Sequence, residues 1–341
     1  MSSKTSILLQ AFTGTNKTVP VWFMRQAGRY LPAYRKIKEK HRLEEMFGNP
    51  DLAAKITCLP LKSLEVDALI LFADILTLPS RMGFKITFSD QLGPVIASPI
   101  QKESDLKKIH NFDNLDSVSQ TIHKIKQQIP DHLPLIGFAG APFTVLCYLI
   151  EGGSSIHFNK TFRFLYTKPS SFHKMMTILT ENTIRYLKLQ QQAGIQVFQL
   201  FDTWAGILKA SDYQNFILPY VQKIFTQVKL PSIYYLRGSQ HLLALMEKSE
   251  AHFLSLCHEV VLGQDPILEK TRLGVQGNLF NLLLYADKRM LKQELQKVLQ
   301  GARHHQKYIF NLSHGVLPDT SVEKLKFLIE QVHQFPWTNS A

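Results

Sequence analysis

The sequence contains few cysteines, and none of them stands in a pattern typical of a disulfide framework or a metal site. Cys58, Cys147 and Cys257 lie far apart in the 341 residues, and no C-x-x-C spacing occurs. An odd number of widely separated cysteines favours neither disulfide bonds nor a structural zinc site. We therefore expect a protein of a reducing compartment, the cytoplasm.

Long apolar runs are also missing. The stretch "TVLCYLI" stops after seven residues, far below the roughly 20 that cross a bilayer. The N-terminal stretch "MSSKTSILLQAF" has no small-residue cleavage site, so it predicts a first helix rather than a signal peptide. We expect a soluble protein without a membrane partner.

The motifs of several large enzyme classes are absent. There is no G-x-x-x-x-G-K-[ST], no G-x-G-x-x-G after a strand, no H-E-x-x-H and no G-x-S-x-G, which argues against phosphate cradles, dinucleotide folds, zincins and serine hydrolases. The net charge of +12 is dispersed rather than collected with stacking aromatic residues. The charge therefore does not indicate a nucleic-acid partner.

Short apolar runs recur along the whole chain, and most are followed by a segment of helical periodicity. The eight runs are 19–24, 67–72, 135–140, 195–201, 232–236, 252–257, 272–277 and 308–312. Apolar strands that alternate with helices predict a parallel sheet covered on both faces. We predict an α/β protein with one domain over residues 1–341, a single (β/α)8 TIM-type barrel. A doubly wound open sheet is the alternative.

The stretch 83–100, "GFKITFSDQLGPVIASPI", alternates polar and apolar residues around a turn. This pattern predicts a hairpin inserted after the second strand. Such a hairpin could shape the mouth of a site.

Polar side chains follow several of the predicted strands, at the end of a barrel where chemistry takes place. They are Arg25, Arg29, Asp74, Asp202, Thr203 and His314. Arg25 and Arg29 are four residues apart, which would place both guanidinium groups on one side of a helical turn, and Gly28 would let a ligand approach the backbone. Such groups bind carboxylates through paired hydrogen bonds. The alternative is that each arginine pairs with a local acid or caps a helix.

Two further features belong to this end of the predicted barrel. Asp74 directly follows the apolar stretch 68–73, so we expect it to be largely removed from water and to need a partner; a salt bridge or a helix cap would also explain it. The segment 137–155 predicts a short apolar helix that starts at Pro142 and stops at Gly152, with Thr144 and Tyr148 on one face. Tyr148 would bring a hydroxyl group to that face, although most such tyrosines are core residues.

These residues resemble a known family. "MRQAGRYLPAYR" and "GFAGAPFTVLCYLIEGG" are similar to two long signatures of the uroporphyrinogen decarboxylases, and "LFADIL", "FDTWAG" and "NLSHG" are similar to three shorter motifs of that family, in the same order. The resemblance runs from about residue 20 to about residue 315.

The resemblance implies a carboxy-lyase of haem biosynthesis. Members form a homodimeric βα barrel, use no metal or organic cofactor, and convert the four acetate side chains of uroporphyrinogen III to methyl groups, which gives coproporphyrinogen III. Carried over position by position, catalysis falls on Arg25, Arg29 and Asp74. Substrate binding falls on Arg25, Gln26, Ala27, Gly28, Arg29, Asp74, Tyr148, Thr203 and His314.

Several positions depart from the family pattern. Thr203 and Ala73 stand where serine is usual, Ser313 stands where glycine is usual, and "GNLFN" replaces Gly-Asn-Leu-Asp-Pro with Phe280 and Asn281. Cobalamin-linked methyltransferases share the superfamily and are the alternative function. They bind zinc through histidine and cysteine at strand ends, whereas Cys257 and His258 are adjacent here. A basic protein that binds nucleic acid or porphyrin without turnover is a third possibility.

Overall fold

A curled parallel sheet forms the centre of the protein. The computed structural model describes residues 5–89, 91–112 and 115–337. Seven parallel strands stand in the order β1-β4-β5-β6-β7-β8-β9. Their bounds are β1 Leu69–Ile70, β4 Leu135–Gly140, β5 Val197–Asp202, β6 Ser232–Leu236, β7 Phe253–Ser255, β8 Gly274–Gln276 and β9 Tyr308–Ile309. Each strand falls inside a predicted apolar run, except that β5 extends one residue beyond its run, and the bounds of β4 and β6 are those predicted.

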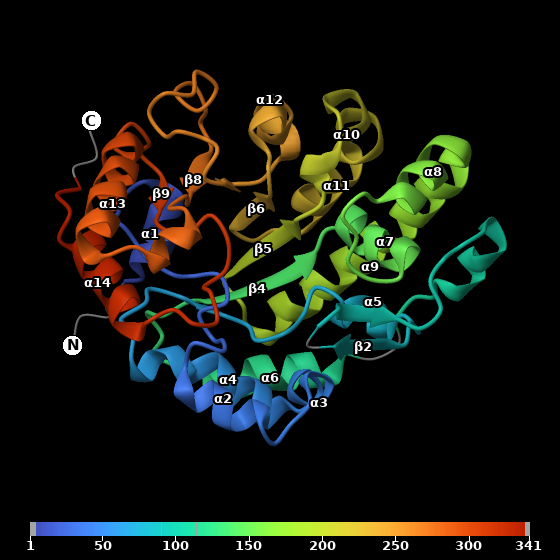
Figure 1. The fold of residues 1–341 in the computed structure, drawn as a ribbon, viewed down its shortest axis with the longest axis horizontal. Helices are drawn as coiled ribbons and strands as arrows, with labels where there is room; N and C mark the ends of the chain where they lie inside the picture. Colours follow the sequence, from blue (N-terminus) through green and yellow to red (C-terminus); the bar gives the residue numbers. More distant parts are fainter. Residues whose placement is uncertain (1–4, 90, 113–114, 338–341) are drawn as a thin grey trace.

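Helices connect the strands and cover the outside of the sheet. They are α1 Ile7–Thr13, α2 Pro32–Lys38, α3 Leu43–Gly48, α4 Pro50–Cys58, α5 Thr77–Arg81, α6 Asp116–Lys126, α7 Pro142–Glu151, α8 Asn159–Thr167, α9 Pro169–Ala193, α10 Ala210–Phe216, α11 Leu218–Gln227, α12 Leu243–Met246, α13 Lys288–Ala302 and α14 Val322–His333. Short 3-10 helices are η1 Leu59–Lys62, η2 Glu103–Lys108, η3 Ala205–Ile207, η4 Gln240–Leu242, η5 Glu247–Ser249 and η6 Asn281–Tyr285. Figure 1 shows β4, β5 and β6 in the middle, with α13 and α14 on one flank and α4 and α6 on another.

Residues 19–24 occupy the eighth position of the ring, between β9 and β1. On one side the Phe310 N–H donates to the Pro20 carbonyl at 2.9 Å, and on the other the Asp67 N–H donates to the Val21 carbonyl at 2.8 Å. The prediction of a full strand here is wrong, because only Val21 forms a ladder bridge, with Phe310. The Val21 N–H donates instead to the Asp67 carboxylate at 2.7 Å. Side-chain acceptors thus replace part of the ladder where the barrel closes.

The predicted hairpin is confirmed. Strands β2 (Ile86–Ser89) and β3 (Gly93–Ile96) pair antiparallel. The Ile96 N–H donates to the Gly152 carbonyl at 2.9 Å, so the hairpin is fixed to the C-terminal end of α7. It therefore stands beside the same end of the barrel as the polar side chains described above.

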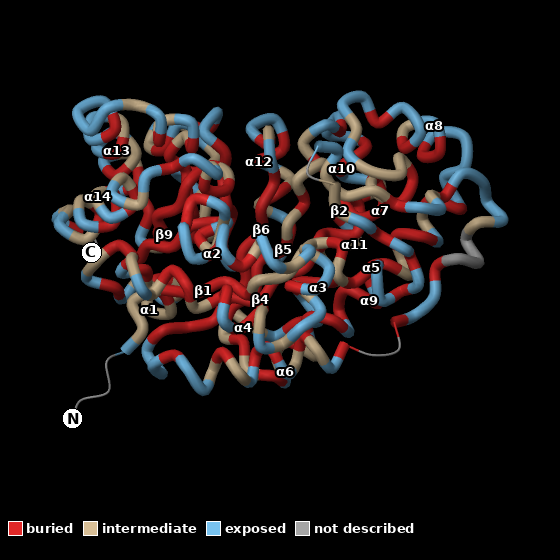
Figure 2. The backbone as a smooth tube through the Cα atoms, turned by 60° about the horizontal axis from the view of Figure 1, so that its bottom comes forward, coloured by how far each residue is buried: buried red, intermediate tan, exposed pale blue. Residues whose placement is uncertain are grey.

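The interior is apolar and continuous. The buried side chains come from every strand of the large sheet and from the inner faces of the helices, and Figure 2 shows the buried chain running through the middle of the molecule with exposed segments outside. Packing between strands and helices is what stabilises such a barrel. Within the residues that the structure describes, no helix combines the length and the apolar character needed to span a membrane.

Candidate active site

A cavity of about 520 Å³ opens at the C-terminal ends of the strands, a size within the usual range for small-molecule sites. Its polar lining residues are Arg25, Asp74, Tyr148, Ser154, Thr203, Tyr235, Arg237 and His314, and its aromatic walls include Phe47, Phe72, Phe88, Phe138, Phe201 and Trp204. The cavity therefore combines flat apolar walls with two guanidinium groups and one carboxylate.

Six of the nine residues named from the sequence line this cavity. They are Arg25, Ala27, Asp74, Tyr148, Thr203 and His314. They come from separate places in the chain, and the closure of the barrel brings them together because all follow the C-terminal ends of ring segments.

The other three lie in the same turn but outside the cavity lining. The Gln26 side chain is buried, accepts the Phe23 N–H at 3.0 Å and donates to the Ala68 carbonyl at 3.0 Å, so it holds the turn together. A Cβ on Gly28 would lie 2.9 Å from the Arg25 carbonyl oxygen. This glycine is therefore needed for the packing of the turn itself, and our expectation that it admits a ligand finds no support in the contacts. Arg29 is exposed.

Arg25 and Arg29 do not share a helical turn as predicted. The backbone of Arg25 has a φ of 61°, in the left-handed region that a helix cannot continue. Arg25 lies inside a turn closed by the Gln26 N–H to the Phe23 carbonyl. A second turn is closed by the Leu31 N–H to the Gly28 carbonyl, and α2 begins only at Pro32. The Arg25 side chain lies against Gly315, where a Cβ would overlap it.

Asp74 is fixed by a reciprocal turn. Its Oδ1 accepts the Leu76 N–H at 2.8 Å, and its own N–H donates to the Thr77 hydroxyl at 3.1 Å. Burial raises the pKa of the Asp74 carboxyl to about 6, although the Leu76 N–H and the nearby Arg25 charge both act to lower it. Asp74 is largely removed from water, as expected, and its partial exposure remains where it lines the cavity. Its Oδ2 accepts no hydrogen bond from another described residue and is free for a ligand.

His314 is neutral at physiological pH. Burial lowers its pKa to about 4, and the charges of Arg25 and Arg237 act in the same direction. A neutral imidazole can donate one N–H and accept at the other nitrogen. On the opposite wall, burial raises the pKa of the Tyr148 hydroxyl above its ordinary value, so this group also stays neutral and available as a donor.

A buried network supports the wall that carries Tyr148, Thr203 and Trp204. The Asp202 carboxylate accepts the Thr144 hydroxyl at 2.7 Å and the Tyr234 hydroxyl at 3.0 Å. The Thr144 oxygen in turn accepts the Trp204 N–H at 3.1 Å. The network thus joins α7, which holds Tyr148, to the loop after β5, which holds Thr203.

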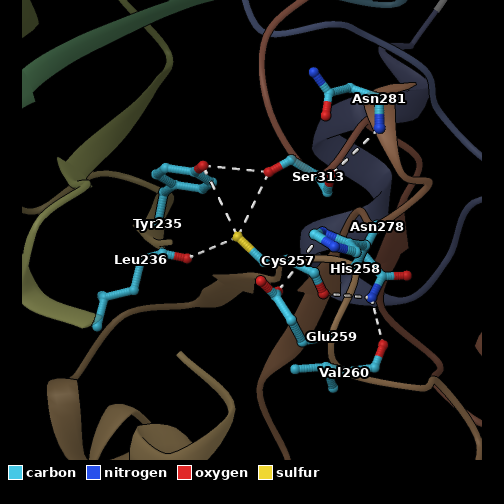
Figure 3. Close-up of polar contacts among 9 residues, drawn as sticks. All are labelled: Tyr235, Leu236, Cys257, His258, Glu259, Val260, Asn278, Asn281 and Ser313. Atoms are coloured by element: carbon cyan, nitrogen blue, oxygen red, sulfur yellow. Dashed lines mark hydrogen bonds and ion pairs between the residues drawn. The ribbon is translucent and has the colours of Figure 1, made fainter. Parts of the chain in front are cut away.

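Below Tyr235, a second layer of polar contacts links the ends of β6, β7 and β8 to the loop of His314 (Figure 3). The carbonyl of Ser313 accepts the Tyr235 hydroxyl at 3.2 Å and the Cys257 thiol at 3.6 Å. The thiol also lies 3.3 Å from the Leu236 carbonyl, and burial raises its pKa. Cys257 is therefore a neutral packing group beneath the cavity.

Two departures from the family pattern meet in this layer. The Asn281 N–H donates to the Ser313 hydroxyl at 3.4 Å, and its side chain donates to the Gly315 carbonyl at 3.3 Å. Phe280 stacks on the His258 ring with centroids 3.9 Å apart. The loop of residues 277–281 is thus packed against the chain around His314.

Comparison with known proteins supplies the family. A model of the uroporphyrinogen decarboxylase (URO-D) family matches residues 3–335. A uroporphyrinogen decarboxylase from Thermodesulfovibrio yellowstonii is 42% identical over 318 residues, which cover 93% of this chain and 94% of that protein. One from Aquifex aeolicus is 40% identical over 342 residues, with 98% and 99% covered.

The chain belongs to the uroporphyrinogen decarboxylase family. The fold alone is shared more widely: a methyltransferase from Methanosarcina mazei superposes with a TM-score of 0.81 at 18% identity, covering 97% of this chain and 99% of that one. At that identity the likeness carries no functional argument, so the methyltransferase alternative is the weaker one. Among the described residues, no three histidine, cysteine, aspartate or glutamate side chains gather as a metal site requires.

The cavity lining also contains residues that the sequence patterns had not indicated. Arg237 and Trp204 line the cavity, yet neither was among the predicted site residues. Arg237 carried a readable signal, because it directly follows the apolar run 232–236 just as Arg25 follows the run 19–24.

Proposed function

We propose that the protein is a carboxy-lyase that converts the four acetate side chains of uroporphyrinogen III to methyl groups, giving coproporphyrinogen III. The chain belongs to the decarboxylase family, and the observation that carries the proposal is its cavity. In that cavity one carboxylate, Asp74, lies with two guanidinium groups among aromatic walls. Aromatic walls suit a macrocycle, and guanidinium groups suit its many peripheral acids.

The chemistry needs an electron sink. A proton added to the pyrrole ring creates one; the bond from the acetate methylene to its carboxylate then breaks, the electron pair moves into the ring, and CO2 leaves. A proton adds to the methylene carbon to form the methyl group, and the ring loses its extra proton. In the balance, one proton replaces each CO2.

Asp74 would accept pyrrole N–H groups and stabilise the cationic ring electrostatically. Its Oδ1 already accepts the Leu76 N–H at 2.8 Å, so its position is set before the substrate arrives, and preorganised charge of this kind is effective in catalysis. Arg25 would hold the departing carboxylate. Tyr148, Thr203 and His314 would contact peripheral acids as neutral donors.

Arg29 has a different place in the proposal. It is exposed and outside the cavity lining, so it would bind an acid side chain that projects from the mouth. Gln26, Ala27 and Gly28 would shape the turn that presents Arg25. We include no metal and no organic cofactor, because the proposed proton transfers need neither.

We also propose that one domain spans residues 1–341, and that the protein works as a homodimer in the cytoplasm. The family resemblance supports the dimer, which light scattering at micromolar concentration would test. Free thiols at Cys58, Cys147 and Cys257 fit a reducing compartment.

Anaerobic incubation with uroporphyrinogen III tests the activity directly. We expect intermediates with seven, six and five carboxylates and then the product with four, separated by chromatography without any added cofactor. Recovery of the unchanged substrate, or activity that disappears on chelation and returns with zinc, would contradict the proposal.

A further inference from the structure

Arg237 is a second cation of the cavity. It follows the end of β6 and lines the cavity with Tyr235, two residues earlier. Residues two apart on a strand point to the same face. Its guanidinium group forms no hydrogen bond or ion pair with another residue that the structure describes, and the same is true of Arg25. Both charges are therefore available to a ligand.

The two arginines follow ring segments that lie on opposite sides of the barrel. Around the ring the order is residues 19–24, β1, β4, β5, β6, β7, β8 and β9. Arg25 follows the first of these segments and Arg237 follows the fifth, which is half-way round in either direction. Asp74 follows β1, beside the Arg25 segment.

The packing around Arg237 fixes its backbone. A Cβ on Gly206, in the loop after β5, would overlap the Arg237 carbonyl oxygen, so the two loops are in direct contact. Both arginine charges also act on the same groups, because each helps to lower the pKa of His314. The field of Arg237 thus reaches the wall of the cavity next to Arg25.

We propose that Arg237 binds a substrate carboxylate at the edge of the macrocycle opposite the one held by Arg25. The guanidinium groups of Arg25 and Arg237 would together hold two acid side chains of one substrate and fix the ring over Asp74. This subsite rests on the proposed function for the identity of the ring. It favours substrates that carry acids on opposite edges over substrates with acids on one edge.

The test compares three variants. Arg237→Gln removes the charge, Arg237→Lys keeps the charge without the fork, and Arg289→Gln removes an exposed charge from α13, away from the cavity lining. The probe for binding is uroporphyrin, the oxidised ring with all eight carboxylates, followed by fluorescence. KM and kcat are measured anaerobically with uroporphyrinogen III, and melting temperatures verify the fold.

We expect Arg237→Gln to weaken uroporphyrin binding about tenfold, which corresponds to about 1.4 kcal/mol. KM should rise by a similar factor while kcat changes much less, because the interaction is made before and during the reaction alike. The uroporphyrin affinity of Arg237→Lys should lie between those of Arg237→Gln and the unmodified protein, because lysine keeps the charge but lacks the paired donors. Arg289→Gln should bind as tightly as the unmodified protein. The pKa of His314, followed by NMR, should rise in Arg237→Gln alone.

Equal affinity in Arg237→Gln and Arg289→Gln would overturn the subsite, even if the pKa of His314 rises, because the charge would then reach the cavity without holding an acid. A fall in kcat at unchanged KM would also overturn it. If the unmodified protein binds uroporphyrin through Arg237 but does not decarboxylate the reduced ring, the subsite stands and the proposed function fails.

Discussion

At the scale of single residues, Asp74 carries a negative charge in a cavity whose other two permanently charged side chains, Arg25 and Arg237, are positive. A carboxylate that only added to the field would repel a substrate with eight acids. Asp74→Asn keeps the size, removes the charge and turns an amide donor towards the pyrrole donors. We expect turnover to fall by about 10²-fold or more, as when one oxyanion-hole donor is lost, with weaker substrate retention. Binding and single-turnover rates measure this.

The same carboxyl group predicts a pH dependence. Its pKa is raised to about 6, mainly by burial, and the ionised form is the one that accepts N–H bonds. We therefore expect kcat/KM to fall as the pH drops through about 6. The Arg25 charge lowers this pKa, so in Arg25→Gln we expect the same fall in kcat/KM to begin at a higher pH. Tighter binding with normal turnover in Asp74→Asn would show that the residue is a bystander.

Arg25 and Arg29 differ in place, so their variants should differ in effect. Both side chains are exposed, but Arg25 lines the cavity and Arg29 lies outside its lining. We expect Arg25→Ala to lower kcat severely, and Arg29→Ala to raise KM with a smaller loss in kcat, because a charge outside the cavity lining is more strongly screened by solvent and salt than one inside it. Steady-state kinetics with thermal melts separate the two. Identical losses in both variants, or a large loss of stability, would contradict the assignment.

Residue types at strand ends were enough to predict four cavity residues, Arg25, Asp74, Thr203 and His314, because a closed barrel brings these ends to one mouth. Ala27 came from the family resemblance alone. Neighbours within one turn were harder. Gln26 faces the interior and Arg25 the cavity, and this follows from the left-handed backbone at Arg25, which the sequence pattern of an arginine does not reveal. The substrate roles of all nine residues stay predictions.

At the scale of elements, two departures from the expected family pattern, Asn281 and Ser313, are in direct contact. The family's proline has no N–H and its glycine has no hydroxyl, whereas here the Asn281 N–H meets the Ser313 hydroxyl at 3.4 Å. Both groups are buried. Asn281 is also the first residue of η6, a position that accepts proline.

A double-mutant cycle tests this pairing. Ser313→Gly leaves a buried N–H without that acceptor, which costs about 1–2 kcal/mol, and Asn281→Pro leaves the hydroxyl unpaired. The double variant should cost less than the sum, with a coupling energy of about 1 kcal/mol. Urea unfolding of the four proteins gives the coupling. Additive losses would show that the two substitutions are independent.

Secondary structure was predictable where the apolar pattern was strong. The core strands β4, β5 and β6 and the hairpin follow their predicted ranges, because buried strands need continuous apolar side chains. The closing segment 19–24 was not predictable as irregular, because two of its N–H groups donate to the side chains of Asp67 and Asn311 in place of a strand partner. Those residues are distant in sequence and carry no local signal.

At the scale of the whole molecule, one carboxylate joins the closure of the barrel to the C-terminal helix. Asp67 Oδ2 accepts the Val21 N–H at 2.7 Å and lies 2.8 Å from His333 Nε2 on α14. Burial acts to lower the pKa of His333, but the hydrogen bond and the charge of Asp67 raise it above its ordinary value. The protonated pair is therefore favoured by folding.

The sign of the pH effect follows. A histidine whose pKa is raised in the folded state contributes stability that is fully present below its unfolded pKa of about 6.5 and is lost as the pH rises through the folded value. We expect His333→Gln to lower the free energy of unfolding by about 1–2 kcal/mol at pH 6 and by much less at pH 9. Urea unfolding at both values tests this. Equal losses would indicate a neutral hydrogen bond instead.

The contact of Gly206 with the Arg237 carbonyl has a consequence for protein engineering. Because a side chain at 206 would overlap that oxygen, the loop after β5 and the loop after β6 form one transplantable unit. A chimera that exchanges only one of them brings a foreign backbone against a surface with no room for a methyl group. Libraries that aim to change substrate preference should therefore vary both loops together and keep glycine at this position.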